Sequence, residues 1–500
     1  MGFGGSLGRP LDLASMSEMK SLKLLVVAAG TATAVLSYFG TGLYPIWPLL
    51  WFAPVPIIAI APQLRVSRAF ALATVAWFIG QTNLWKHLAY GIGLPWPLIV
   101  VSFLMSAVVF TAGALLVRSY LRRGSLILAA IALPIWWVTF EYISATVSPH
   151  ATYGNLAYTQ MDCLPLIQIA SVTGIWGISF AVFLFGGAAG ALLSGAGDQE
   201  QRRMVAIATA VVLCLVFLFG SWRLRSNPQA RSIAVTLIAK DVPMTVYLGS
   251  EEQALELLRE YADEVRRAIP AGTELIVLPE KVARVSENVL PRVDALFASA
   301  ASATGATIDI GLVRRTSSSA FNSSRVYSPN EKLPANYDKH HLLLGAEPEQ
   351  PGKPNERVLL NLPIGRAGLQ ICKDMDFPRL SREYARDGAS LLLVPAWDFN
   401  LDRWLHARMA VLRGVENGFA LARAGRNGLL TLSDNRGRIL AEKATVSGAF
   451  VSLSGKLDVA REKTFYTQTG DWFAWLCISG LVVLLVSRAP PAFWRPVTLK

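Results

Sequence analysis

The chain has 500 residues, of which 53% are hydrophobic and 16% are charged, and its mean hydropathy is +0.40. Because soluble globular proteins carry about 25% charged residues, this composition excludes an ordinary soluble enzyme and predicts membrane spans. The net charge of +12 would suit a nucleic-acid-binding protein, but the lysines and arginines are spread along the chain, many at the ends of apolar runs. Membrane orientation accounts for that distribution, so we expect no nucleic-acid partner.

Long apolar runs fill the N-terminal part of the chain and return once near the C-terminus. A helix that crosses a bilayer needs about 20 mostly apolar residues. Runs of that kind predict about eight spans, at residues 23–41, 43–62, 68–90, 94–118, 124–142, 166–195, 204–222 and 470–487. No convincing small-residue cleavage site follows the first run, so we expect a retained span rather than a signal peptide.

The basic residues outside these runs predict the orientation of the chain. Most fall on alternate connections, namely Lys20, Lys23, Arg65, Arg68, Arg118, Arg122, Arg123, Arg202, Arg203, Arg488 and Arg495. The other connections hold little more than Lys86. Because cytoplasmic loops carry the excess of Lys and Arg, the N-terminus is expected to be cytoplasmic. Seven spans then put the soluble stretch between the last two spans on the outer face.

The soluble stretch alternates short apolar strands with amphipathic helices. The expected strands are residues 232–240, 274–279, 307–313, 357–363, 366–372, 390–396, 428–433 and 449–454. Several have the Val, Ile and Leu density of strands that are buried on both faces. A helix is expected at 251–268, because Ser250 and Gln253 form a capping box before apolar residues at helical spacing. This alternation predicts a layered α/β domain.

Three residues that could carry chemistry follow apolar strands. They are Glu280 in LIVLPEK, Lys339 in NYDKHHLLLGAE and Cys372 in LQICKDMDFP. Each alone has an ordinary explanation, as a turn residue, an exposed lysine or a small core residue. Together they suffice for acyl transfer, because a carboxylate can take the thiol proton and an ammonium can stabilise the tetrahedral oxyanion.

Metal and disulfide chemistry find little support. The four cysteines contain no CxxC pair and lie far apart, and the five histidines contain no HExxH motif. There is also no glycine-rich phosphate-binding motif. We therefore expect no metal, no cofactor and no disulfide framework.

The order, spacing and local sequence of Glu280, Lys339 and Cys372 resemble the Glu, Lys, Cys triad of the carbon-nitrogen hydrolase, or nitrilase, superfamily. The resemblance implies an αββα sandwich. It also implies the roles of the three residues: Glu280 is the general base, Lys339 the oxyanion stabiliser and Cys372 the nucleophile.

The membrane part narrows the resemblance to the apolipoprotein N-acyltransferase family. The segments LPIWWVTFEYI (133–143), YGNLAYTQ (153–160) and PLIQIASVTGIWGISF (165–180) are similar to that family. A helical stretch after the nucleophile also keeps the family's spacing, at His406, Met409, Ala410, Arg413, Glu416 and Gly418. The resemblance covers nearly the whole chain.

This family resemblance implies a domain order and a location. Residues 1–225 are expected to form a transmembrane domain of seven helices, 226–465 the nitrilase-like domain, and 466–500 the last span and a cytoplasmic tail. The protein is then a multi-pass protein of the bacterial inner membrane with its catalytic domain on the periplasmic face. We expect it to be a monomer.

The implied reaction moves a fatty acyl chain from a phospholipid donor, through a thioester on Cys372, to the N-terminal amine of a diacylglyceryl-modified lipoprotein. Glu347 matches an additional Glu that this family places eight residues after its catalytic Lys, on a loop over the active site. Its implied role is to position Lys339 or the acceptor amine.

The chain departs from the family pattern near the nucleophile. The family has Tyr then Glu after its cysteine, whereas this chain has Lys373 and Asp374. A second cation beside the thiol should favour thiolate. The PAWDF segment around Trp397 is nearer to soluble nitrilases and amidases, and Tyr247 is the nearest aromatic where the family has a tryptophan. We expect Lys373, Asp374 and Trp397, like Glu347, to bind substrate or to support the site.

Two other functions stay open at this point. The PAWDF segment and Lys373 are also compatible with a membrane-tethered amidase or nitrilase that acts on a small extracytoplasmic amide or nitrile. A degenerate scaffold that only binds lipoprotein or lipid is the non-enzymatic alternative, but the presence of the complete triad argues against it.

Overall fold

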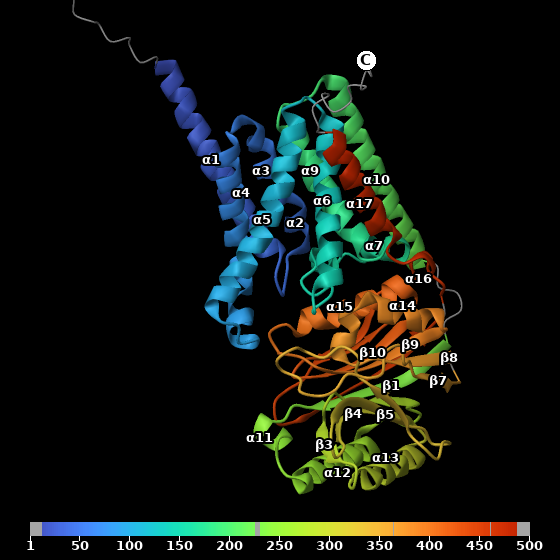
Figure 1. The fold of residues 1–500 in the computed structure, drawn as a ribbon. Helices are drawn as coiled ribbons and strands as arrows, with labels where there is room; N and C mark the ends of the chain where they lie inside the picture. The colour runs from blue at the N-terminus through green and yellow to red at the C-terminus, as the bar shows by residue number, and fades with distance from the viewer. Residues whose placement is uncertain (1–12, 226–230, 364, 461, 488–500) are drawn as a thin grey trace, which may run out of the picture. The chain divides into compact units, whose positions relative to one another are not determined.

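The computed structural model describes residues 13–225, 231–363, 365–460 and 462–487 (Figure 1). Its contacts divide the chain into two compact units. The first contains the residues up to Trp85 together with Pro95–Trp137 and Val182–Ala210. The second contains Lys86–Leu94, Val138–Ala181 and the chain from Val211 onward.

Within the described residues, five helices are long and apolar enough to cross a membrane. They are α1 (Leu13–Gly40), α5 (Trp96–Leu121), α6 (Leu126–Val147), α9 (Trp176–Leu193) and α10 (Gln199–Arg225). Each corresponds to one span expected from the sequence. The multi-pass α-helical part of the predicted fold is therefore confirmed, although the number of spans is approximate.

The other three expected spans are shorter or interrupted. The run 43–62 forms α2 (Trp47–Phe52) and α3 (Val55–Ile60), followed by the 3₁₀ turn η1 (Ala61–Gln63). Pro54 lies between α2 and α3 and lacks the N–H that a continuous helix needs. The run 68–90 becomes the 16-residue α4 (Val66–Gln81), a 3₁₀ turn η2 (Thr82–Leu84) and a π-helical turn η3 (His87–Gly91). The last run forms α17 (Trp472–Ser487), also 16 residues long.

The sixth expected span also begins later than its apolar run. Residues 164–173 form the short helices α7 (Leu164–Ile167) and α8 (Ala170–Thr173), which precede α9. Of the basic residues that predict the orientation, Arg488 and Arg495 lie outside the described residues.

Two buried polar side chains show how groups within the first unit are paired in apolar surroundings. Trp77 of α4 stacks on Phe110 of α5 with ring centroids 4.1 Å apart, and its indole N–H donates to Ser106 Oγ at 3.1 Å. Arg118 in the last turn of α5 donates to the carbonyl oxygens of Ala61 at 3.0 Å and Leu64 at 2.6 Å. These bonds fasten α5 to the turn that follows α3.

The second unit contains two β-sheets. The first is seven-stranded, with order β13-β1-β2-β4-β5-β6 and β3 paired to β4. Its strands are β1 (Arg231–Lys240), β2 (Leu275–Val277), β3 (Ala283–Ser286), β4 (Thr307–Arg315), β5 (Ala320–Tyr327), β6 (Ala335–Asp338) and β13 (Phe450–Val459). The second is six-stranded, with order β12-β11-β10-β9-β8-β7. Its strands are β7 (Leu359–Leu362), β8 (Gly365–Leu369), β9 (Ala389–Trp397), β10 (Ala420–Arg426), β11 (Leu429–Ser433) and β12 (Ile439–Ala444).

The two sheets pack face to face and are covered by helices on their outer faces. One core cluster joins residues of both sheets, among them Leu237, Val277, Leu369 and Leu393. A second cluster packs α12 (Glu251–Ala268) and α13 (Leu290–Thr304) on the first sheet. The helices α14 (Pro378–Arg386) and α15 (Arg403–Asn417) lie on the opposite side, beside β9 and β10 (Figure 1). This is the αββα sandwich that the sequence predicted.

The expected helix at 251–268 is confirmed with its cap. Ser250 Oγ accepts from the Gln253 N–H, and Gln253 Oε1 accepts from the Ser250 N–H. All eight expected strands are present, but five others, β3, β5, β6, β10 and β12, were not predicted. The strand β5 (AFNSSRVY) is too polar for the apolar pattern, although six of its eight residues are buried.

A carboxyl group inside the first sheet makes stability depend on pH. Asp309 of β4 is fully buried, accepts a hydrogen bond from Ser324 Oγ at 2.6 Å through Oδ1, and has no partner for Oδ2 among the described residues. Burial raises the pKa of Asp309 to about 7. Since the folded pKa exceeds the unfolded one, the folded state binds the extra proton, and stability falls as pH rises from about 4 to about 7.

We therefore expect Asp309→Asn to stabilise the full-length protein at pH 8 by about 1–3 kcal/mol and to have little effect near pH 4. Thermal unfolding of both proteins in detergent at the two pH values measures this difference. Asp458→Asn, at an exposed position on β13, is the matched control. An equal change in Tm at both pH values for Asp309→Asn would contradict the assignment.

Candidate active site

The three candidate catalytic residues each follow a strand of the second unit. Glu280 follows β2, Lys339 follows β6 directly, and Cys372 begins the 3₁₀ turn η5 (Cys372–Asp376) after β8. Glu280 and Lys339 are each 2% exposed, and Cys372 is partly buried. Each of the three residues lies in the loop or turn that follows its strand. Residues that are distant in sequence can therefore lie close together at the ends of the strands.

The ammonium of Lys339 lies between two carboxylates. Its Nζ is 2.8 Å from Glu280 Oε1 and 2.8 Å from Glu347 Oε2. Burial by itself lowers the pKa of Lys339, but the charges of Glu280 and Glu347 outweigh burial and hold that pKa well above its ordinary value. Lys339 is therefore a fixed positive charge at any physiological pH.

Asn322 of β5 joins the same two carboxylates and was not predicted from the sequence. Its Nδ2 donates to Glu280 Oε1 at 2.6 Å and to Glu347 Oε1 at 2.9 Å. Asn322 is fully buried. The amide of Asn322 is a neutral donor. It orients the Glu280 carboxylate without placing a second charge beside it.

The side chain of Glu347 is buried and hydrogen-bonded, although the residue lies in a loop. Besides Asn322 and Lys339, its oxygens accept from the backbone N–H of Leu343 at 2.7 Å and from Lys281 Nζ at 2.8 Å. Burial alone raises the pKa of Glu347, but Lys339 and Lys281 outweigh it and lower that pKa to about 2. Glu347 thus holds the loop after Lys339 in place and, together with Glu280, holds the Lys339 ammonium.

The charged residues Glu280 and Lys339 affect the pKa of the Cys372 thiol. The charges of Glu280 and Lys339 both act on it, with opposite effects. Burial raises the pKa of the Cys372 thiol well above its ordinary value, and the Glu280 carboxylate raises it further. The sulfur donates to the backbone oxygen of Trp397 at 3.6 Å. The resting sulfur is therefore a thiol, and a base must remove its proton before it can attack.

The backbone is strained at Cys372 and at Lys281, the residue after Glu280. Cys372 has φ +42° and Lys281, next to Glu280, has φ +51°, in the left-handed region that side chains with a Cβ rarely adopt. The turn at Glu280 also passes against Gly311 of β4, where a Cβ would lie 2.5 Å from the Glu280 Cα. Such strain is concentrated at functional sites, because the surrounding structure must hold it.

Asp374 braces the turn that carries the thiol. Its carboxylate accepts from the backbone N–H of Ile371 at 3.1 Å, from that of His341 at 2.9 Å and from the Tyr337 hydroxyl at 2.8 Å. It therefore ties the start of η5 to the chain around Lys339. The supporting role expected of Asp374 stays a prediction, which these three contacts favour.

The other two predicted supporting residues do different things. The Trp397 ring lies 3.9 Å from the Arg426 guanidinium and contacts the Tyr247 ring edge-on, with centroids 5.3 Å apart. The Trp397 backbone oxygen accepts the hydrogen bond from the Cys372 sulfur. The Lys373 side chain extends to His150, with Nζ 3.0 Å from Nδ1.

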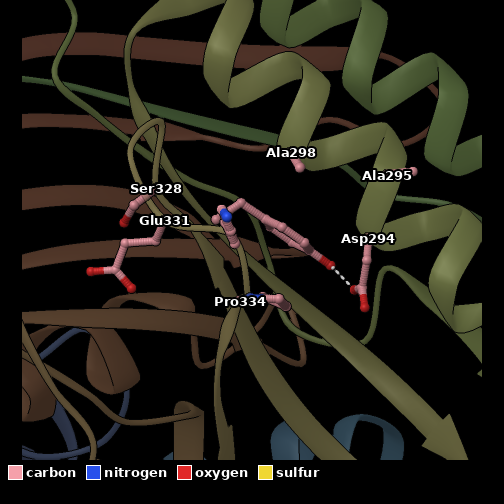
Figure 2. A pocket seen from close by; sticks show the side chains of 8 residues that line it. Asp294, Ala295, Ala298, Ser328, Glu331 and Pro334 are labelled. Atoms are coloured by element: carbon pink, nitrogen blue, oxygen red, sulfur yellow. Dashed lines mark hydrogen bonds between the residues drawn. The ribbon is translucent and has the colours of Figure 1, made fainter.

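A pocket elsewhere on the same unit holds none of these residues. It is lined by Asp294, Ala295 and Ala298 of α13 and by Tyr327, Ser328, Glu331, Lys332 and Pro334 (Figure 2). The Tyr327 hydroxyl donates to Asp294 Oδ1 at 2.8 Å across it. Because none of its lining residues is a cysteine, the cluster around Cys372 is the better candidate site for chemistry on a thiol.

Family models match two parts of the chain. A model described as "Apolipoprotein N-acyltransferase N-terminal domain" matches residues 33–188, and one described as "Carbon-nitrogen hydrolase" matches residues 237–455. A solved structure of Saccharomyces cerevisiae Nit3, described as a member of the nitrilase superfamily, is 21% identical and covers 46% of this chain and 90% of its own, with a TM-score of 0.38.

Similar curated proteins extend over most of the chain. The apolipoprotein N-acyltransferase of Geobacter metallireducens is 29% identical and covers 92% of this chain and 94% of its own. That of Thermotoga maritima is 26% identical and covers 88% of this chain and 89% of its own. The N-terminal match favours acyl transfer over a tethered amidase or nitrilase. The chain therefore carries matches to an apolipoprotein N-acyltransferase N-terminal domain and to a carbon-nitrogen hydrolase domain, in this order, and is similar to apolipoprotein N-acyltransferases over most of its length.

Proposed function

We propose that this protein moves a fatty acyl chain from a phospholipid to the N-terminal amine of a diacylglyceryl-modified lipoprotein, through a thioester on Cys372. The observation that carries the proposal is the Lys339 ammonium held between Glu280 and Glu347, with Glu280 and Lys339 both acting on the Cys372 thiol. The similarity to apolipoprotein N-acyltransferases supports the reaction class and the lipoprotein acceptor.

In the first half-reaction the Cys372 sulfur attacks the carbonyl carbon of the phospholipid ester. Glu280 takes the thiol proton as the S–C bond forms. When the tetrahedral intermediate collapses, the ester C–O bond breaks and Glu280 returns the proton to the leaving alkoxide. The products are a fatty thioester and a lysophospholipid, and Glu280 is a carboxylate again.

In the second half-reaction the neutral α-amine of the acceptor attacks the thioester carbonyl. The C–N bond forms, Glu280 takes a proton from the amine nitrogen, and the C–S bond breaks. The proton then passes from Glu280 to the departing sulfur. One carboxylate thus serves as base and acid in both halves, which is why its orientation by Asn322 and Lys339 matters.

Lys339 stabilises the oxyanion in both halves. An ammonium has three N–H donors, and two of them are engaged by Glu280 and Glu347. The third is available for the developing negative charge on the substrate oxygen. Because the donors are already oriented, little reorganisation is needed in the transition state.

The thioester must be protected from water, because hydrolysis would compete with the amine. We propose that the membrane provides this protection. In this arrangement residues 1–225 and 466–500 form the membrane part, and 226–465 form a catalytic domain on the periplasmic face of the inner membrane. Donor lipid enters from the outer leaflet, and the protein acts as a monomer.

Mass spectrometry of lipoprotein N-termini tests this function. Bacteria that lack this protein are complemented with the wild-type chain or with Cys372→Ala. Wild type should add the mass of one acyl group to the N-terminal cysteine, and Cys372→Ala should not. Equal masses in the two strains would reject lipoprotein acylation, and acylation by Cys372→Ala would reject the thioester.

A further inference from the structure

Lys373 is a buried cation directly next to the proposed nucleophile. Its side chain is 7% exposed, and its Nζ lies 3.0 Å from His150 Nδ1 and 3.8 Å from Asp376 Oδ2. The ammonium also faces the Phe377 ring, 5.8 Å from its centroid. A buried ammonium normally needs full pairing, so this position requires an explanation.

The pairing of Lys373 within the described residues is incomplete. His150 Nδ1 accepts one hydrogen bond, and the Asp376 carboxylate lies beyond hydrogen-bond distance. Burial lowers the pKa of Lys373 despite the nearby carboxylate of Asp376. Since an ammonium carries three N–H groups, Lys373 can still donate to an anion from outside the protein.

The partner, His150, marks the end of an apolar helix. It lies on the turn that follows α6, and its side chain is exposed. The same turn is fastened to the nucleophile turn, because Thr152 donates through both its N–H and its Oγ to the Asp376 carbonyl oxygen, at 3.3 and 2.7 Å. Where an apolar helix of 22 residues ends, a membrane protein meets the lipid headgroups.

We propose that Lys373 and His150 form a site for the phosphodiester of the acyl donor and give this protein a preference for anionic phospholipids. The inference rests on the proposed function. In a phospholipid the phosphate is joined through the glycerol to the ester under attack, so a cation one residue from Cys372 is well placed to hold it. Lys373 also repels the ammonium of phosphatidylethanolamine, which phosphatidylglycerol lacks.

The experiment compares two donors with identical acyl chains, phosphatidylglycerol and phosphatidylethanolamine, using the purified full-length protein. Thioester formation at Cys372 is followed by mass spectrometry. Wild type should use phosphatidylglycerol about tenfold faster. Lys373→Gln should bring the two rates within about twofold by raising the KM for phosphatidylglycerol, and Lys373→Arg should keep the preference. If Lys373→Gln prefers phosphatidylglycerol over phosphatidylethanolamine as strongly as wild type does, the assignment is overturned.

Lys332→Gln is the matched control, because Lys332 is exposed and belongs to the same unit. It should keep the wild-type preference. Inorganic phosphate is added as a competitor to separate a lipid site from a free-anion site. Inhibition by phosphate at the concentration at which phosphatidylglycerol saturates would show a free-anion site and overturn the lipid assignment.

A binding measurement separates this inference from the proposed function. Cys372→Ala protein cannot form the thioester, so bound lipid can be counted by native mass spectrometry. Retention of phosphatidylglycerol over phosphatidylethanolamine should be lost when Lys373→Gln is added to Cys372→Ala. If retention is selective but wild type forms no thioester with either lipid, the proposed reaction fails while the headgroup site stands.

Discussion

Glu280→Gln lowers the rate of thioester formation at Cys372 by about a thousandfold at neutral pH. The amide keeps an oxygen that can accept from Lys339 Nζ and Asn322 Nδ2, which are 2.8 and 2.6 Å from the Glu280 oxygen. It cannot take the thiol proton. Because the Cys372 thiol has a pKa well above its ordinary value, almost no thiolate forms without a base.

The pH dependence of this variant distinguishes a lost base from a lost fold. Removing the Glu280 charge also removes one cause of the raised pKa of Cys372, so the variant should gain thiolate as pH increases. Its acylation rate should therefore rise with pH, toward the wild-type rate. Glu331→Gln, at an exposed position in the same unit, is the control. A Glu280→Gln protein with wild-type rates at neutral pH would refute the assignment of the base.

Lys339→Met should lower thioester formation by about a thousandfold and also destabilise the protein by about 3–5 kcal/mol. The catalytic loss follows from the missing oxyanion donor. The loss of stability follows because the Glu280 carboxylate would stay buried without its cation, while Glu347 would keep its contact with Lys281. At neutral pH one carboxyl would take up a proton, and the base would be compromised as well.

A double variant separates the two losses. Lys339→Met combined with Glu347→Gln removes the cation together with one of its two carboxylate partners. Thermal unfolding should show stability returning part of the way toward the wild-type value, because one of the two buried carboxylates that faced the lost cation is gone, while Lys281 keeps its contact with Glu349 at 3.0 Å. Thioester formation should stay low, since the oxyanion donor is still absent. Recovery of acylation in the double variant would show that Lys339 has only a structural role.

The sequence predicted the layers of the catalytic unit because its buried strands are rich in Val, Ile and Leu. It failed where buried strands carry polar residues. The clearest case is β5, whose Asn322, Ser323 and Ser324 are all fully buried and all hydrogen-bonded. Such a strand has no periodic apolar pattern in its sequence. Its polar side chains can be buried because they form hydrogen bonds with residues elsewhere in the chain, and the local sequence does not show those partners.

The same limit applies to the candidate site. Glu280 and Cys372 could be found from their positions after predicted apolar strands. Lys339 stood out through the resemblance to the family triad, because β6 (ANYD), which precedes it, is too polar to be predicted. Asn322 and Lys281 could not, because what makes them notable is contact with Glu347 across the fold. The positive φ of Cys372 and Lys281 is likewise invisible in a sequence without glycine at those positions.

The membrane part shows a different limit. Hydropathy located every apolar run, but it did not show where a run would break. Pro54 separates α2 from α3, and the segment after α4 continues as 3₁₀ and π-helical turns. Composition over a window of 20 residues averages over such interruptions, whereas the backbone hydrogen bonds of a helix depend on each residue.

The most direct test of the account is the acylation state of Cys372 itself. Full-length protein is incubated with a phospholipid and no acceptor, digested, and the peptide that contains Cys372 is weighed by mass spectrometry. The account predicts the added mass of one fatty acyl group on that peptide, removed by neutral hydroxylamine and absent from Cys372→Ala. An unmodified Cys372 peptide from protein that nevertheless acylates its acceptor would contradict it.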